Sequence, residues 1–128
     1  MNDMSHEPRL AYGSIPALTK DEIAGAVERG DPAELHVVVL AAALGIDDVE
    51  WAQGVCLSLA RHSDPLVRGN AILGLGHLAR IHRTLDRGIV QPAVLAALSD
   101  PDDYVRGQAD CAADDVERFL RWKLRRSD

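Results

Sequence analysis

The chain has 128 residues, 47% of them hydrophobic and only 4% aromatic, and its formal net charge is −6. This length predicts one domain that buries a core without metals or disulfides, and the scarcity of aromatic residues favours helix packing over a β-sandwich. Nine basic and nineteen acidic residues precede Arg118, a balance of −10 that disfavours nucleic acid as a partner, because Lys and Arg must replace condensed counterions.

The start of the chain differs from the rest. Residues 1–17 lack apolar periodicity and contain Pro8, Gly13 and Pro16, so we expect a flexible arm followed by one folded domain at residues 18–128. The first ten residues are polar and include no secretory apolar segment, which indicates a cytoplasmic protein. No apolar run approaches the ~20 residues of a transmembrane helix, so no membrane association is expected.

Two helices are predicted directly after the arm. Thr19 and Glu22 have the spacing of a capping box at the start of the first helix, and Gly30 is typical of its end. Asp31 and Pro32 are a strong start signal for the second, because Asp caps a helix and Pro gives up only an N–H that would lack a partner there. The second helix is apolar on nearly all sides, which predicts that it is buried.

Two further helices follow in the middle of the chain. Asp47 is expected to cap the third, whose apolar residues recur at i, i+3 and i+4 spacing. Asp64 and Pro65 then repeat the Asp-Pro start signal for the fourth helix. Its glycines stand inside a helical pattern, where they allow neighbouring helices to approach closely.

The last third of the chain contains two more helix starts. Thr84 and Pro92 bracket the start of the fifth helix, with Pro92 expected in its first turn, where a missing N–H is tolerated. Asp100 and Pro101 precede the sixth, expected over about residues 103–124. No segment alternates apolar and polar residues as a half-buried strand would, so no strands are predicted.

The Asp-Pro signal recurs after 33 and then 36 residues, once in each successive pair of helices. The three pairs cover approximately residues 19–45, 47–82 and 86–124. A repeat of this length with two helices per unit is typical of an α-solenoid, because a single hairpin cannot bury its own apolar face. The sequence therefore predicts an all-α protein, an α-solenoid of about three helical hairpins.

The segments "LSLARHSDPLVRGNAILGLG" and "LAALSDPDDYVRGQADCA" resemble HEAT repeats. The resemblance covers residues 47–120 and is weaker over 19–45, which keeps Asp-Pro but lacks Val-Arg. In HEAT proteins the turn aspartate and the helix arginine form a hydrogen-bonded ladder between neighbouring units. The resemblance implies this ladder at Asp64, Arg68, Asp100 and Arg106. It implies little about function, because the architecture serves many functions.

In size, charge and helical-repeat fold the chain also resembles immunity proteins of bacterial toxin systems, which block a toxin by protein–protein contact. This resemblance implies a non-catalytic inhibitor whose partner is a toxin domain. The acidic balance of the chain independently favours a basic protein partner, because opposite fields speed the encounter. The predicted function is thus the binding of a basic protein.

The second copy of the Asp-Pro and Val-Arg pattern carries carboxylates where the first copy has Ile72, Gly76, His77 and Ala79. The candidate partner-binding carboxylates are Asp103, Asp110, Asp114, Asp115 and Glu117. The alternative is that they form only the polar cap that a terminal repeat needs, since it has no successor to cover it. If the binding surface lies elsewhere, the next candidates are three residues of the fourth helix, Asn70, His77 and Arg80.

The histidines bear on the alternative that the chain is a metal-dependent enzyme. His77 and His82 are five residues apart, which directs their rings to different faces of a helix, so neither a metal site nor a cofactor is predicted. HEAT-like hydroxylases bind iron through repeated His-Glu pairs, and the only such pair is His6-Glu7 in the arm. A HEAT-like enzyme of the metal-dependent or lyase type remains the alternative function.

Two weaker alternatives concern the cysteines and the C-terminus. Cys56 and Cys111 are expected as reduced thiols in a cytosolic protein, and neither has the electropositive surroundings of a nucleophile. The end of the chain, "RFLRWKLRR", interleaves Phe119 and Trp122 with cations, as a nucleic-acid-binding segment does. More often such a run is a helix end that its dipole favours, so nucleic acid is predicted to be an unlikely partner.

Overall fold

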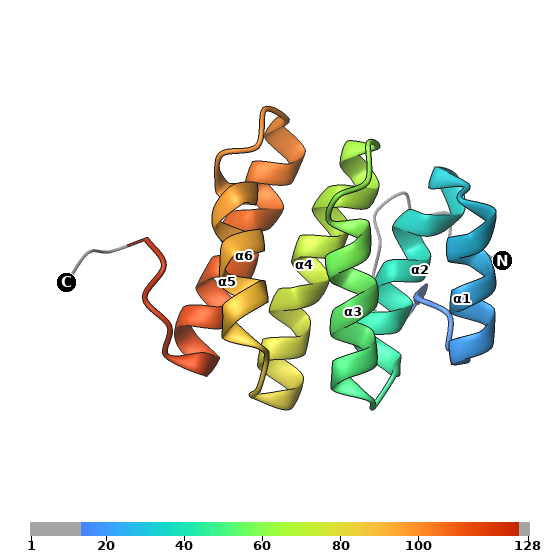
Figure 1. Ribbon diagram of the computed structural model, residues 1–128, viewed down its shortest axis with the longest axis horizontal. Helices are drawn as coiled ribbons and strands as arrows, with labels where there is room; N and C mark the ends of the chain where they lie inside the picture. Colours follow the sequence, from blue (N-terminus) through green and yellow to red (C-terminus); the bar gives the residue numbers. More distant parts are fainter. Residues whose placement is uncertain (1–13, 126–128) are drawn as a thin grey trace, which may run out of the picture.

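The computed structural model describes residues 14–125, which form six α-helices and no strand (Figure 1). The predicted all-helical class is confirmed. Most of the expected arm at residues 1–17 falls outside the described residues, and so do residues 126–128. The helices are α1 (Lys20–Arg29), α2 (Pro32–Gly45), α3 (Val49–Leu59), α4 (Pro65–His82), α5 (Arg87–Leu98) and α6 (Asp103–Leu120).

Side chains of the predicted type cap the starts of the helices. The capping box of Thr19 and Glu22 is present, and Gly30 ends α1 in the left-handed conformation. Asp31 caps α2 and Asp64 caps α4, each followed by proline, as the sequence indicates. These predictions hold because a cap depends on hydrogen bonds between residues two or three positions apart.

Three predicted helix start signals are wrong. Asp102 caps α6, two residues after the expected Asp100, by accepting from the backbone N–H of Tyr104 at 2.8 Å. Asp48 caps α3 instead of Asp47, through a bond of 3.1 Å from the backbone N–H of Trp51. Asp86 caps α5, so Pro92 lies inside this helix and not in its first turn. A proline there removes one backbone hydrogen bond, and α5 tolerates it because Pro92 is exposed and water can reach the backbone.

The predicted end of the sixth helix at Leu124 is also wrong. The helix ends at Leu120 because Arg121 takes a left-handed conformation, with φ of 64°. The chain then turns back along the molecule. Trp122 is only 8% exposed and packs against the core, and Arg125 returns to the outer surface of α6.

Helix α4 is the centre of the molecule. It contacts α2, α3, α5 and α6, and eleven of its 18 residues are buried. Glycines permit the closest approaches. A Cβ atom on Gly69 would lie 2.8 Å from the ring of Tyr104, and one on Gly76 would lie 2.9 Å from the Cα of Ala112. Because both contacts are with α6, these two glycines set the spacing between α4 and α6.

The helices lie roughly in chain order across the molecule, from α1 at one side to α5 and α6 at the other (Figure 1). A single apolar core made mainly of Ala, Val, Leu and Ile runs through all six. Cys56 is fully buried in it, and burial raises the pKa of its thiol to about 12, whereas Cys111 is exposed; both are free thiols. Within residues 14–125, no helix has the length and apolarity needed to cross a membrane.

Candidate partner-binding surface

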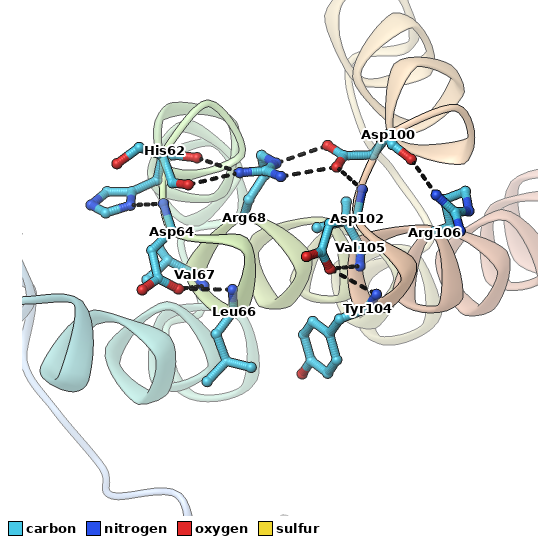
Figure 2. Close-up of polar contacts among 11 residues, drawn as sticks. His62, Asp64, Leu66, Val67, Arg68, Asp100, Asp102, Tyr104, Val105 and Arg106 are labelled. Atoms are coloured by element: carbon cyan, nitrogen blue, oxygen red, sulfur yellow. Dashed lines mark hydrogen bonds and ion pairs between the residues drawn. The ribbon is translucent and has the colours of Figure 1, made fainter.

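Arg68 joins the second pair of helices to the third. Its Nε donates to Asp100 Oδ2 at 2.8 Å and its Nη2 to Asp100 Oδ1 at 2.9 Å, in a two-pronged contact (Figure 2). Its Nη1 also donates to the carbonyl oxygens of His62 and Ser63, at 3.0 and 3.1 Å. The guanidinium holds the pKa of Asp100 below its usual value. This arrangement connects the turn before α4 with the turn before α6.

The other two residues of the implied ladder make different contacts. The carboxylate of Asp64 accepts from the backbone N–H of Leu66 at 2.8 Å and therefore serves as a cap. Arg106 donates to the carbonyl oxygen of Asp100 at 2.7 Å (Figure 2). It also pairs with Asp103, three residues earlier in α6. Arg106 thus holds its own turn together and does not bridge successive pairs.

The first pair of helices explains why Asp64 lacks an arginine from a preceding unit. Arg68 follows the capping Asp64 by four residues, whereas Leu35 stands four residues after the capping Asp31. Leu35 is buried and apolar. Among the described residues, the arginine–aspartate bridge between successive pairs therefore occurs once, at Arg68 and Asp100.

Three of the candidate carboxylates form one stripe along α6, and Arg125 covers part of it. The Nη2 of Arg125 lies 2.5 Å from Asp114 Oδ1 and 2.5 Å from Glu117 Oε1, and its Nη1 lies 3.8 Å from Asp110 Oδ1. The bond from Arg125 is the main reason that the pKa of Glu117 falls to about 2. Asp110 and Asp114 keep 68% and 71% of their side chains exposed. We call Asp110, Asp114 and Glu117 the acidic stripe.

The other two candidate carboxylates lie apart from this stripe. Asp115 faces α4, where its Oδ2 would be 3.0 Å from a Cβ atom on Gly76. Its burial raises its pKa, and the nearby Arg80 partly opposes this shift. Asp103 stands at the start of α6, is exposed, and pairs with Arg106. Spacing along one helix brings three of the five carboxylates together, and the packing of α6 separates the others.

Asn70 links three helices. Its Nδ2 donates to the carbonyl oxygen of His36 in α2 at 2.8 Å, and its Oδ1 accepts from the hydroxyl of Tyr104 in α6 at 2.5 Å. Asn70 is 1% exposed, whereas Tyr104 is 37% exposed. Sequence reasoning did not single out Tyr104. A comparison of the two Val-Arg copies could have singled it out, because the polar Tyr104 precedes the second copy where the apolar Leu66 precedes the first.

His77 and Arg80 form a second polar pair on α4. The Nη2 of Arg80 lies 3.1 Å from the Nδ1 of His77, which is 3% exposed. Burial, with a smaller contribution from Arg80, lowers the pKa of His77 to about 4. The ring is therefore neutral near pH 7, and Nδ1 accepts a hydrogen bond from the guanidinium. The described residues include no group of three or more His, Cys, Asp or Glu that could hold a metal.

Arginines cover the aromatic rings at the C-terminal end of α6. Arg83 lies over Phe119 at 4.8 Å from the ring centroid, and Arg118 lies over the same ring at 5.6 Å. Arg87 lies 5.5 Å from the ring centroid of Trp122. Nucleic-acid binding by stacking requires free aromatic faces. These two rings instead make cation–π contacts within the protein.

An apolar cleft of about 510 Å³ lies among α3, α4 and α5, and sequence reasoning did not anticipate it. Ile72 and the ion pair of Arg68 with Asp100 line it together with exposed residues of α5, including Ile89, which is 50% exposed. The sequence does carry one sign of this cleft, since Pro92 and the alanines that follow it leave α5 with only one bulky side chain, Ile89, on that side.

No family model matches the chain, and no curated protein matches it. Among solved structures, the chain is similar to a chain in the crystal structure of the CDI complex from Cupriavidus taiwanensis LMG 19424. The two are 27% identical, and the match covers 87% of this chain and 98% of the other, with a TM-score of 0.74. The match thus extends over nearly the whole of both chains and is not confined to one helical hairpin.

Proposed function

We propose that this chain is a non-catalytic, immunity-type protein that binds and neutralises a toxin domain in the cytoplasm. The observation that carries the proposal is the match to a chain of a CDI complex, which is a toxin–immunity system. At 27% identity over 87% of the chain, the likeness extends to sequence as well as helix arrangement. Binding without catalysis also fits an interaction scaffold, whose function resides in its surface and not in its fold.

The scaffold proposed for this function is a solenoid of three HEAT-like hairpins, α1–α2, α3–α4 and α5–α6. Contacts of α2 with α4 and of α4 with α6 support it, because the second helices of successive hairpins stack in such a solenoid. The bridge from Arg68 to Asp100 supports it as well, since it joins the turns of two successive pairs. Stacked hairpins provide an extended surface for a partner protein.

We place a basic region of the partner on the acidic stripe. Asp110 and Asp114 are mostly exposed, so a cation from outside can reach them. Arg125 shows that a guanidinium fits this position, since it contacts all three carboxylates of the stripe. The formal charge of −6 would attract a basic partner over longer distances. Of the alternative candidates, Asn70 and His77 are buried, so the alternative contact residues are Arg80 and Tyr104, which lie beside them and reach the surface.

The decisive experiment pairs this chain with the protein encoded by the neighbouring gene, which the proposal takes to be the toxin. We expect the two to co-purify at 1:1 stoichiometry and this chain to restore growth of cells that express the toxin. An unrelated toxin domain of similar charge is the control, because it tests whether attraction alone explains binding. If the neighbouring toxin neither binds this chain nor loses toxicity when the two are co-expressed, the proposal is wrong.

A further inference from the structure

The C-terminal ends of α4 and α6 carry positive charge in an otherwise acidic chain. Residues 80–87 and 115–125 contain seven Lys and Arg against three Asp and Glu. Four exposed arginines dominate this part of the surface. We call them the arginine cluster: Arg83, Arg87, Arg118 and Arg121.

Aromatic rings hold three of the four arginines in place. Two guanidinium groups, those of Arg83 and Arg118, lie over Phe119 at 4.8 and 5.6 Å, and Arg87 lies 5.5 Å from Trp122. Like charges gathered on neighbouring rings repel one another unless an anion joins them. Between residues 14 and 125, no carboxylate forms an ion pair within 4.0 Å of any arginine of the cluster. Asp115 interacts with Arg118 electrostatically, but it interacts more strongly with Arg80.

Two arginines of the cluster, Arg83 and Arg121, have a backbone conformation that glycine adopts more easily. Arg83 and Arg121 have φ of 59° and 64°, and they are the only non-glycine residues with positive φ in residues 14–125. They end α4 and α6 at equivalent positions, 38 residues apart, as Val67 and Val105 are. Gly30 ends α1 in the same conformation without a side chain. A glycine would relieve the strain at both positions, so a role outside folding is expected for the arginines.

We infer that the arginine cluster binds a carboxylate-rich surface of a protein partner. Guanidinium groups match carboxylates in two-pronged geometry. The cation–π contacts fix Arg83, Arg87 and Arg118 in place before binding, which reduces the entropy lost on association. Nucleic acid fits less well, because the arginines already cover the faces of Phe119 and Trp122 and the chain carries a net charge of −6.

This inference rests on the proposed function only in taking the partner to be a protein, and it refines the partner's chemistry. The acidic stripe lies along α6, whereas the cluster lies at the C-terminal end of α6, in the turn after α4 and at the start of α5. A partner that contacts both regions must therefore present a basic and an acidic patch side by side. Such paired patches fix the orientation of a complex more strongly than one charged patch does.

The first test uses an octapeptide of alternating Asp and Glu as the probe and the full chain as the target. We expect the peptide to shift the Nε–Hε NMR signals of the cluster arginines, whereas the signal of Arg29, which pairs with Glu34, should stay in place. Changing Arg118 and Arg121 together to Gln should weaken peptide binding at least fivefold. The matched control changes Arg29 and Arg61 to Gln, which alters the net charge by the same amount away from the cluster.

A second variant separates binding from folding. Arg121→Gly should raise the thermal midpoint, because glycine adopts positive φ without strain, and should still weaken binding of the peptide. The inference is overturned if the peptide leaves the cluster signals unchanged, if the control variant loses as much affinity as the cluster variant, or if a 12-nucleotide oligo-dT binds the cluster more tightly than the peptide does.

Toxin binding distinguishes the two proposals. If the peptide binds the cluster but the neighbouring toxin does not bind the chain, the proposed function fails and the inference about the cluster stands. If the toxin binds the chain but the cluster shows no response to the peptide, the inference fails and the proposed function stands.

Discussion

Arg68 donates two hydrogen bonds to Asp100 across 32 residues of sequence and so connects the turn before α4 to the turn before α6. The two side chains are 19% and 12% exposed, so solvent screens this pair less than it screens a surface ion pair. We expect Arg68→Ala to lower the free energy of unfolding by about 1–3 kcal/mol, the range for losing one partner of a charged hydrogen-bonded pair. Urea unfolding at pH 7 measures this difference.

Arg29→Ala is the matched control, since it also removes an arginine from a two-pronged contact, with Glu34, but at an exposed site. Its unfolding midpoint should stay close to that of the wild type. Equal losses in the two variants would show that the bridge between helical pairs has no special stabilising role.

Gly76 allows α4 and α6 to approach, and we expect Gly76→Ala to be destabilising. The added Cβ would lie 2.9 Å from the Cα of Ala112, a backbone atom that cannot move aside easily. Overpacking of this kind typically costs about 1–3 kcal/mol. Gly107→Ala in α6 is the control. No atom lies within 4 Å of its Cβ position, so alanine should leave stability unchanged or raise it by about 0.5–1 kcal/mol. Thermal unfolding of both variants measures the contrast.

The contact of Arg125 with the acidic stripe predicts a defined loss of stability in acid. The pKa of Glu117 is about 2 in the folded protein, below the 4.5 of a free glutamate, chiefly because it accepts a hydrogen bond from Arg125. A lowered folded pKa stabilises the protein above the unfolded value, and this contribution is lost as the pH falls from about 4.5 to about 2. Arg125→Gln should therefore be less stable than wild type at pH 7.

The difference between wild type and Arg125→Gln should shrink steadily below pH 4.5 and be mostly lost at pH 2. Thermal midpoints measured from pH 2 to pH 7 test this. A difference that is constant across this range would mean that Arg125 stabilises the protein by packing and not through the charge of Glu117.

Charge reversal in the acidic stripe tests whether it binds the partner. Asp110→Lys combined with Asp114→Lys should leave the fold intact, because both side chains are mostly exposed. It should weaken binding of the basic partner at least tenfold, or about 1.4 kcal/mol. Wild-type affinity should fall as salt rises, because salt screens this attraction. Calorimetric titration with the toxin domain gives both quantities.

Glu28→Lys combined with Asp47→Lys is the control for this reversal, since both residues are exposed and the change in net charge is the same. If the stripe variant folds and binds as tightly as this control, the stripe is only the polar cap of the last repeat. The contact surface would then lie at Arg80 or Tyr104, because the other two candidates, Asn70 and His77, are buried.

The protein should act without a bound transition metal. Its histidines lack the spacing of ligands, and the Nδ1 of His77 already faces the guanidinium of Arg80 at 3.1 Å. Elemental analysis of untagged protein should find less than about 0.1 equivalent of zinc or iron, far below the full occupancy of a structural or catalytic site. Metal at one equivalent that withstands dialysis would contradict this prediction and favour the enzyme alternative.

The sequence by itself determined the local parts of the fold. Thr19, Asp31 and Asp64 cap helices as predicted, because a cap involves residues two or three positions apart and any chain with that pattern can form it. The all-helical class follows from apolar periodicity, which is local as well. Even the misplaced caps, Asp48 and Asp86, lie within two residues of predicted positions, since several polar residues there compete to begin the helix.

Only the tertiary structure decided which side chains meet. The bond between Asn70 and Tyr104 spans 34 residues, and the contact of Arg125 with the acidic stripe depends on α6 ending early at Arg121. Spacing along α6 could group Asp114 with Glu117 but could not show that Asp115 faces α4. The physical reason is that helical periodicity defines directions around one helix axis, whereas the neighbour in each direction depends on how all six helices pack.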